Sequence, residues 1–275
     1  MTAAQLPEAV INKLPDWQGA AHTELSGGLT NRTWLIEKND CRAVLKIDDH
    51  PRTAPYNERR AEADLQTVAA NAGLANKVLF AAEQVYLTEF VEGTVWDPAH
   101  LDQEGKIEQL ASSLRRLHSL PRSGRSFDAV GAAEGYVRSI EDSDRNLISV
   151  CLGVVNKMQL PAYLCCCHND LVAENIIATP ELKFLDWEYA CDNDPMFDLA
   201  TIVEHHELSE GQARKLLQAY FDGDGERWYP KLVEQQRLYL ALFWLWLAAR
   251  PDRSEKALKR LGARVMHAHA HDDID

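Results

Sequence analysis

The chain has 275 residues, 46% hydrophobic and 26% charged, a composition typical of a folded protein that can bury a substantial core. Its formal net charge of −13 argues against a nucleic-acid partner, whose phosphates need a basic face, and against binding to an anionic membrane. The same acidic balance suits a cationic small-molecule substrate.

The cysteines favour a reducing compartment. Six are present without any CxxC pair, and three are consecutive, so neither a disulfide framework nor a zinc ribbon is expected. In a strand, Cys165 and Cys167 would share one face as small buried side chains. Residues 1–10 lack the features of a signal peptide, and the most apolar stretch, 238–249, is too short to span a bilayer. These patterns predict a cytoplasmic protein.

The first third of the chain has strand-like patterns interrupted by one helical pattern. Apolar and β-branched residues form short runs separated by turns, and Glu92 and Gly93 then mark a change of character. We expect strands at 33–36, 43–47, 77–80 and 85–90, and a helix at 57–71.

Beyond residue 93 helical spacing dominates, apart from short apolar runs at 163–187 that suggest strands and functional loops. The histidine-rich end, 267–271, is expected to be a frayed, solvated terminus. The expected helices are 103–119, 136–155, 212–220 and 230–249.

Three polar residues have the spacing that phosphoryl transfer requires. An Asp and an Asn five residues apart, Asp170 and Asn175, can share one site in which the carboxylate takes a hydroxyl proton and the amide oxygen binds magnesium. Asp186, after an apolar pair, could be a second metal ligand. Taken singly, Asp170 could cap a helix, Asp186 could start a turn and His168 could be a buried histidine. Their order together favours a kinase.

These residues, with segments 185–189 and 194–200, resemble the aminoglycoside phosphotransferase and choline kinase superfamily. The resemblance implies an α+β, bilobal protein-kinase-like fold, with a small β-rich lobe that contains one key helix and a larger, mostly helical lobe. It implies a nucleotide-binding lobe at 1–91, a catalytic and acceptor-binding lobe at 92–275, and ATP and Mg²⁺ as cofactors. Asn169 and Glu188 replace the Arg and Gly usual in protein kinases, which points to small-molecule substrates.

The resemblance also implies roles for the carboxy-terminal residues. Asp170 would be the catalytic base within the loop that His168 begins, and Asp198 would brace that loop. Asn175 and Asp186 would hold magnesium.

In the amino-terminal lobe, Lys46 resembles the strand lysine that contacts the α- and β-phosphates. Its expected ion-pair partner is Glu62, with Glu58 as the alternative. No GxxxxGK occurs, which excludes a P-loop kinase. The remaining nucleotide contacts implied are a loop over the phosphates (Ser26, Gly27, Gly28 and Asn31) and a lobe-connecting hinge whose backbone would receive adenine (Glu89 and Val91).

The acceptor site is predicted from aromatic and acidic residues. Phe243 and Trp246 lie three residues apart, so they would share one helical face, and aromatic faces bind quaternary ammonium groups. Glu188 is the carboxylate best placed to balance a cation, ahead of Glu204 and Glu207. We therefore predict transfer to a primary alcohol of the choline or ethanolamine type. The alternatives are thiamine, then an aminoglycoside or other small molecule, then an inactive kinase-like binding module. No hydrolase motif is present, and the sequence does not indicate the oligomeric state.

Overall fold

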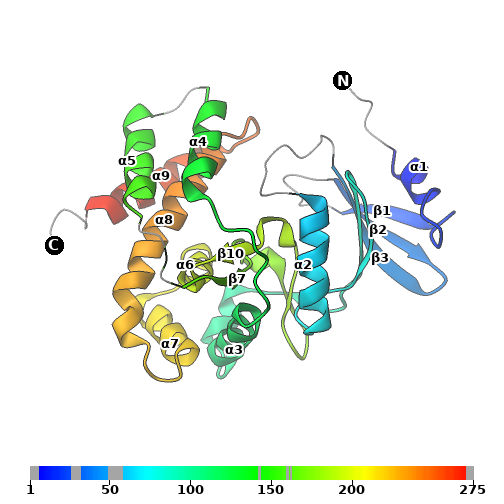
Figure 1. Ribbon diagram of the computed structural model, residues 1–275, viewed down its shortest axis with the longest axis horizontal. Coiled ribbons are helices and arrows are strands. Elements are labelled where there is room, and N and C mark those ends of the chain that lie inside the picture. Colours follow the sequence, from blue (N-terminus) through cyan, green and yellow to red (C-terminus); the bar gives the residue numbers. More distant parts are fainter. Residues whose placement is uncertain are drawn as a thin grey trace.

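The computed structural model describes residues 6–25, 32–48, 58–141, 144–158, 161 and 163–270. Within them a β-rich amino-terminal part is followed by a mainly helical carboxy-terminal part, and α2 stands between the two (Figure 1). The predicted α+β organisation is confirmed. No helix of the described chain is both long and apolar enough to cross a membrane.

The amino-terminal part is a five-stranded antiparallel sheet in the order β1-β2-β3-β5-β4. A short helix, α1, which the sequence patterns did not predict, covers one face of the sheet. The elements are α1 (Pro7–Ile11), β1 (Ala21–Leu25), β2 (Arg32–Lys38), β3 (Cys41–Ile47), α2 (Arg59–Asn71), β4 (Val78–Ala81) and β5 (Val85–Glu89).

Strand β3 shows why this sheet orients a lysine toward the rest of the molecule. Successive side chains of a strand point to opposite faces. Ala43, Leu45 and Ile47 are buried and pack with Val10 of α1 in the core of the amino-terminal part. Lys46 therefore lies on the other face.

Two small sheets follow, each made from segments distant in sequence. Strand β6 pairs with β8, which pairs with β9, while β7 pairs with β10. Gly93 permits the first contact, because a Cβ there would lie 2.5 Å from Ile177 Cγ2 and 2.7 Å from the Ala178 carbonyl oxygen. The strands are β6 (Thr94–Val95), β7 (Cys165–Cys167), β8 (Ile176–Ala178), β9 (Lys183–Phe184) and β10 (Cys191–Asn193).

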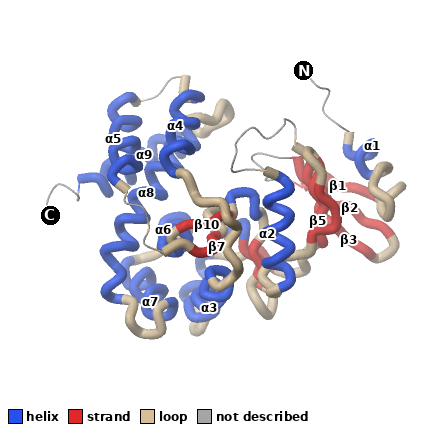
Figure 2. The backbone as a smooth tube through the Cα atoms, in the orientation of Figure 1, coloured by secondary structure: helices blue, strands red, loops and turns tan. Residues whose placement is uncertain are grey.

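Helices enclose these short strands, and β7 and β10 lie at their centre (Figure 2). One core includes α2, α3, α6 and α7 with the short strands, and the other includes α4, α5, α8 and α9. The helices are η1 (Pro98–Asp102), α3 (Lys106–His118), α4 (Ala129–Ser139), α5 (Arg145–Lys157), η2 (Ala173–Asn175), η3 (Trp187–Tyr189), α6 (Pro195–His205), α7 (Glu210–Tyr220), η4 (Glu226–Trp228), α8 (Tyr229–Ala248) and α9 (Glu255–Ala270).

Two sequence expectations are wrong. The single helix expected at 136–155 is two helices, because Ile140 is extended and the Asp144 carboxylate starts α5 by accepting hydrogen bonds from the Asn146 and Leu147 amides. The terminus expected to be frayed is helical as far as Ala270, because Leu258, Leu261 and Val265 anchor α9 in the core.

Candidate active site

The segment between β7 and β8 carries Asp170 and Asn175, and the buried Asp198 carboxylate holds its backbone in place. Asp198 accepts hydrogen bonds from the backbone amides of His168 at 2.9 Å and Asn169 at 2.7 Å. Asn169 has a positive φ of 65°, and its side-chain amide donates to the Tyr189 carbonyl while its oxygen accepts from Asn193. These bonds hold an otherwise unfavourable turn in one conformation.

The sequence around Asp198 explains its position. Asp194 caps α6 by accepting from the Met196 amide, and Pro195 occupies the first helical position, where its missing N–H costs nothing. Asp198 consequently lies in the first turn of α6, directly beneath the loop.

A histidine that the sequence patterns did not single out supports this carboxylate. His118, the last residue of α3, places Nε2 3.1 Å from Asp198 Oδ2, and its Nδ1 lies 2.7 Å from the Tyr220 hydroxyl. All three side chains are buried. No local pattern marks His118, because its contact depends on the packing of α3 against α6 and α7.

Asp170 and Asn175 contact each other as the spacing predicted. The Asn175 Nδ2 donates to both the Asp170 carbonyl and its carboxylate Oδ2, each at 2.9 Å. Burial, together with the charges of Asp186 and Glu188, raises the pKa of Asp170 to about 8, although the Asn175 hydrogen bond and Lys46 act in the opposite direction. Such a carboxylate can accept a proton near neutral pH.

Lys46 forms its ion pair with Asp186 across the two parts of the molecule, at 2.9 Å. Burial alone would lower the pKa of Lys46, but Asp186, Glu62 and Glu188 outweigh it and raise that pKa. Burial would likewise raise the pKa of Asp186, and Lys46 lowers it. The predicted partner Glu62 acts on Lys46 through its charge, while its carboxylate accepts a 2.7 Å hydrogen bond from Arg59.

The donor set around Asp186 and Asn175 fits magnesium, which prefers oxygen ligands. Asp186 Oδ1 is buried and has no hydrogen-bond partner among the described residues. Because Asn175 Nδ2 bonds to Asp170, its amide oxygen is the atom left for a metal. Two oxygens are thus available at one site.

His168 lies behind the site. Its side chain is fully buried, Nε2 donates to the Leu185 carbonyl at 2.9 Å, and the ring packs edge-on against Trp187. Burial lowers its pKa. His168 thus stays neutral and holds the loop against the strand that leads to Asp186.

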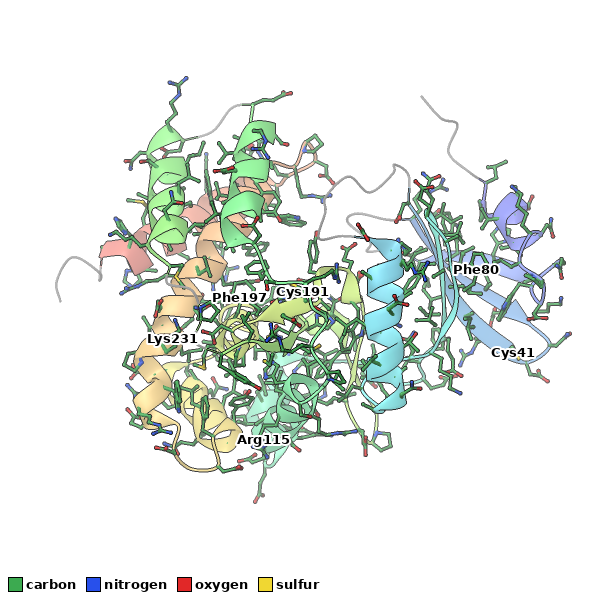
Figure 3. All side chains as sticks on the ribbon, in the orientation of Figure 1. Cys41, Phe80, Arg115, Cys191, Phe197 and Lys231 are labelled. Atoms are coloured by element: carbon green, nitrogen blue, oxygen red, sulfur yellow. The ribbon has the colours of Figure 1, made fainter. Side chains whose placement is uncertain are left out.

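One cavity of about 540 Å³ joins these groups to the carboxy-terminal helices. Its walls include Lys46, Asp170, Asn175, Asp186 and Glu188. Two further wall residues, Cys191 and Phe197, lie near the centre of the molecule, whereas Cys41 lies at the far end of the amino-terminal sheet (Figure 3). The cavity therefore extends from the predicted metal ligands toward a helical surface.

That helical surface is aromatic. Tyr239, Phe243 and Trp246 of α8 line the cavity, with ring centroids 5.7 Å apart for the first pair and 5.9 Å for the second. Trp244 is buried in the core instead. The spacing predicted Phe243 and Trp246 together, and Tyr239, four residues earlier, could have been found by the same rule.

Other cavity residues had no signal in the sequence. Acidic and aromatic side chains from the segment before α4, from α4 and from the catalytic loop also line the cavity. The Arg250 guanidinium lies 5.0 Å from the Trp246 ring centroid and so occupies one face of that ring. The acidic, aromatic and histidine side chains missed in this way include Phe127, Asp128, Tyr136, Glu174, Tyr189 and His205.

The remaining residues predicted to contact the nucleotide lie partly within the described chain. The Glu89 carbonyl accepts a 2.6 Å hydrogen bond from Asn76, which leaves it one further lone pair. Glu89 and Val91 stand outside the walls of the 540 Å³ cavity, and the Glu89 side chain lines a separate groove with Arg42 and Phe90. The predicted phosphate loop, Ser26, Gly27, Gly28 and Asn31, lies outside the described residues.

Together the antiparallel sheet, the helix beside it and the buried loop between small sheets define a bilobal kinase-like protein. Residues 21–231 match the phosphotransferase enzyme family. The chain belongs to this family and is a small-molecule kinase.

Individual relatives agree with this assignment. The chain is 29% identical to the Protein LicA of Haemophilus influenzae, over 86% of this chain and 77% of that protein. It is 28% identical to the thiamine kinase of Salmonella typhimurium, over 78% of this chain and 75% of the relative. Among solved structures, the choline kinase LicA from Streptococcus pneumoniae superposes with a TM-score of 0.81 at 21% identity, covering 96% of this chain and 99% of that one, which confirms the predicted fold.

Proposed function

We propose that the protein transfers the γ-phosphoryl group of ATP to the primary hydroxyl of a small cationic alcohol of the choline or ethanolamine type. The observation that carries this proposal is the joint lining of one cavity by Asp170, by Glu188 and by the aromatic face of α8. A base, a balancing carboxylate and aromatic rings within one space suit a substrate with a hydroxyl at one end and a cation at the other.

In this proposal the amino-terminal part is the nucleotide-binding lobe and the carboxy-terminal part binds the acceptor. Lys46 positions the α- and β-phosphates, and Glu62 contributes charge beside it. Magnesium, held by Asn175 and Asp186, would neutralise charge on the phosphates. The backbone of Glu89 and Val91 would receive adenine.

Asp170 is proposed to orient the acceptor hydroxyl and take its proton. The alcohol oxygen bonds to the γ-phosphorus as the bond from that phosphorus to the β–γ bridging oxygen breaks, so ADP leaves and the proton stays on Asp170. Asp198 and His168 act as positioning residues, because they fix the loop without reaching the cavity.

Thiamine is the second candidate, supported by the thiamine kinase relative. Thiamine is also cationic and ends in a primary alcohol, so the same groups would serve.

An ATP-consumption assay with choline, ethanolamine, thiamine and an aminoglycoside tests the proposal. We expect the highest kcat/KM with choline or ethanolamine, and Asp170→Asn as the matched control should remove the turnover. A preference for thiamine would replace the acceptor while keeping the mechanism. Binding of ATP and choline without any turnover would instead indicate an inactive kinase-like binding module.

A further inference from the structure

A second group of reactive side chains lies behind the catalytic loop, separate from the cavity. Cys165 and Cys167 point to the same face of β7, with their sulfur atoms 3.6 Å apart. A ring nitrogen of His118 lies with them, and the three potential ligand atoms are within 4.8 Å of one another. All three residues are buried. Cys166, between the two, belongs to the opposite face of the strand.

These separations are close to those of a tetrahedral metal centre. Zinc bonds to sulfur at about 2.3 Å, so two thiolates on one tetrahedral ion lie about 3.8 Å apart. The observed 3.6 Å therefore needs almost no change. Closing the imidazole onto the ion requires a movement of roughly 1 Å.

The surroundings of His118 resemble the outer shell of a metal-bound histidine. Its Nε2 bonds to the Asp198 carboxylate, and metal-ligating histidines commonly donate their second ring N–H to such a group. This bond leaves Nδ1 as the ligating atom. The Tyr220 hydroxyl donates to Nδ1 at 2.7 Å, so it lies beside the proposed ion and would be the oxygen to complete the coordination once that hydrogen bond is released.

Charge and hydrogen bonding also permit a buried ion here. Binding of Zn²⁺ to two thiols releases two protons, so the interior gains no net charge. The thiols give up only weak bonds, because the sulfurs of Cys167 and Cys165 lie 3.5 and 3.9 Å from the Asn193 carbonyl oxygen that they share. The 2.7 Å hydrogen bond between Tyr220 and His118 Nδ1 would be replaced by bonds to the ion.

We propose that Cys165, Cys167 and His118 form a binding site for a thiophilic divalent cation of the zinc type, with the Tyr220 hydroxyl completing the tetrahedron. The ion would join the end of α3 to β7, the strand that leads directly into the catalytic loop. It takes no part in phosphoryl transfer and acts as a structural tie between two elements that also pack directly and share the Asp198 carboxylate.

Cobalt absorption tests the site in the whole chain. Cobalt is added in two ways, to the native protein and during refolding, with a non-thiol reductant present throughout. We expect one Co²⁺ per chain, with the d–d bands of tetrahedral cobalt and a thiolate-to-cobalt charge-transfer band. Zinc should then bleach both bands and should also release two protons per chain when added to the metal-free protein. Octahedral cobalt alone, without charge transfer, would indicate binding at oxygen ligands such as Asp186 or at exposed histidines such as His267 and would overturn the proposal.

Matched cysteine variants locate the site. Cys165→Ser and Cys167→Ser should each weaken cobalt binding by at least about tenfold, since even outer-shell changes cost that much. Cys166→Ser and Cys191→Ser should retain wild-type affinity. Circular dichroism establishes that each variant folds. If Cys165→Ser does not fold, Cys165→Ala takes its place. Unchanged cobalt binding in the Cys165 and Cys167 variants would overturn the assignment. So would a Cys165–Cys167 disulfide that mass spectrometry still detects in protein kept with the reductant.

Discussion

At the scale of single residues, Asp170 shows a conflict between stability and activity. Its raised pKa of about 8 means that folding favours the protonated form. The stabilisation is complete below the ordinary value of 3.8 and is lost as pH rises through 8. At neutral pH much of this stabilisation is already lost, because the unfolded chain ionises the carboxyl freely while the folded protein holds its proton.

Asp170→Asn should accordingly lower kcat by about 10²–10⁴-fold. The same change should raise the free energy of unfolding at pH 8 by about 1–2 kcal/mol, a figure that allows for the partial exposure of the Asp170 side chain. Urea unfolding at pH 8 and pH 5 in the absence of nucleotide measures this. The stabilisation should shrink at pH 5. A variant less stable than wild type at pH 8 would contradict the assigned burial cost.

Phe243 provides a test of cation recognition that preserves apolar volume. Phe243→Leu removes the aromatic face, and a cation–π contact is worth about 0.5–2 kcal/mol, so the KM for choline should rise roughly 2–30-fold while that for ATP stays constant. The control is the uncharged isostere of choline in which a tert-butyl group replaces trimethylammonium. Equal changes in KM for both alcohols would show that Phe243 contributes packing alone.

At the scale of elements, the contact of β6 with β8 depends on Gly93. Gly93→Ala should destabilise the protein by about 1–3 kcal/mol, because its Cβ would overlap Ile177 and the Ala178 backbone. Gly153→Ala is the matched control. Gly153 lies within α5 with no atom within 4 Å of an added Cβ, so this change should stabilise by up to about 1 kcal/mol. Denaturant midpoints compare the two, and a neutral Gly93→Ala would show that the strands can separate.

The C-cap residue of helix α6, His206, makes the fold sensitive to acid. Burial lowers the pKa of His206 from 6.5 to about 4, and its Nε2 donates to the Leu171 carbonyl. The unfolded chain therefore binds more protons between these pH values, and stability is lost as pH falls from 6.5 toward 4.

We expect this histidine to remove at most about 3 kcal/mol over that range, which unfolding titrations at successive pH values can measure. His206→Gln, whose amide can still donate to Leu171, should flatten the dependence. An unchanged slope in the variant would assign the acid sensitivity to other groups.

Elements also show what sequence can predict. Strand β3, the loop with Asp170 and Asn175, and the face shared by Phe243 and Trp246 were found because each depends on spacing within one element. Lys46 was identified by its resemblance to the phosphate-contacting strand lysine, but its pairing with Asp186 depends on how distant segments pack. His118 and Phe127 were missed for the same reason, since their roles arise only from long-range contacts.

At the scale of the whole molecule, nucleotide binding should join the two parts. If MgATP bridges Lys46 and Asp186, a concentration near 100 times Kd adds about 2.7 kcal/mol of stability, which corresponds to a rise in Tm of roughly 5–10 °C. Thermal melts should show this rise in wild type and in Asp170→Asn. Asp186→Asn should lose most of it, and a full shift in that variant would argue against its role as a metal ligand.

The ion pair between Lys46 and Asp186 has one more consequence, for the order in which ligands arrive. In the nucleotide-free protein an ammonium group already neutralises the carboxylate, 2.9 Å away. A bare divalent ion must compete with that ammonium, whereas an ion carried by a triphosphate brings the anionic oxygens that draw Lys46 aside. The nucleotide-free enzyme should therefore bind magnesium–nucleotide in preference to free magnesium. Lys46 both competes with the free ion for Asp186 and binds the phosphates that accompany the complexed ion.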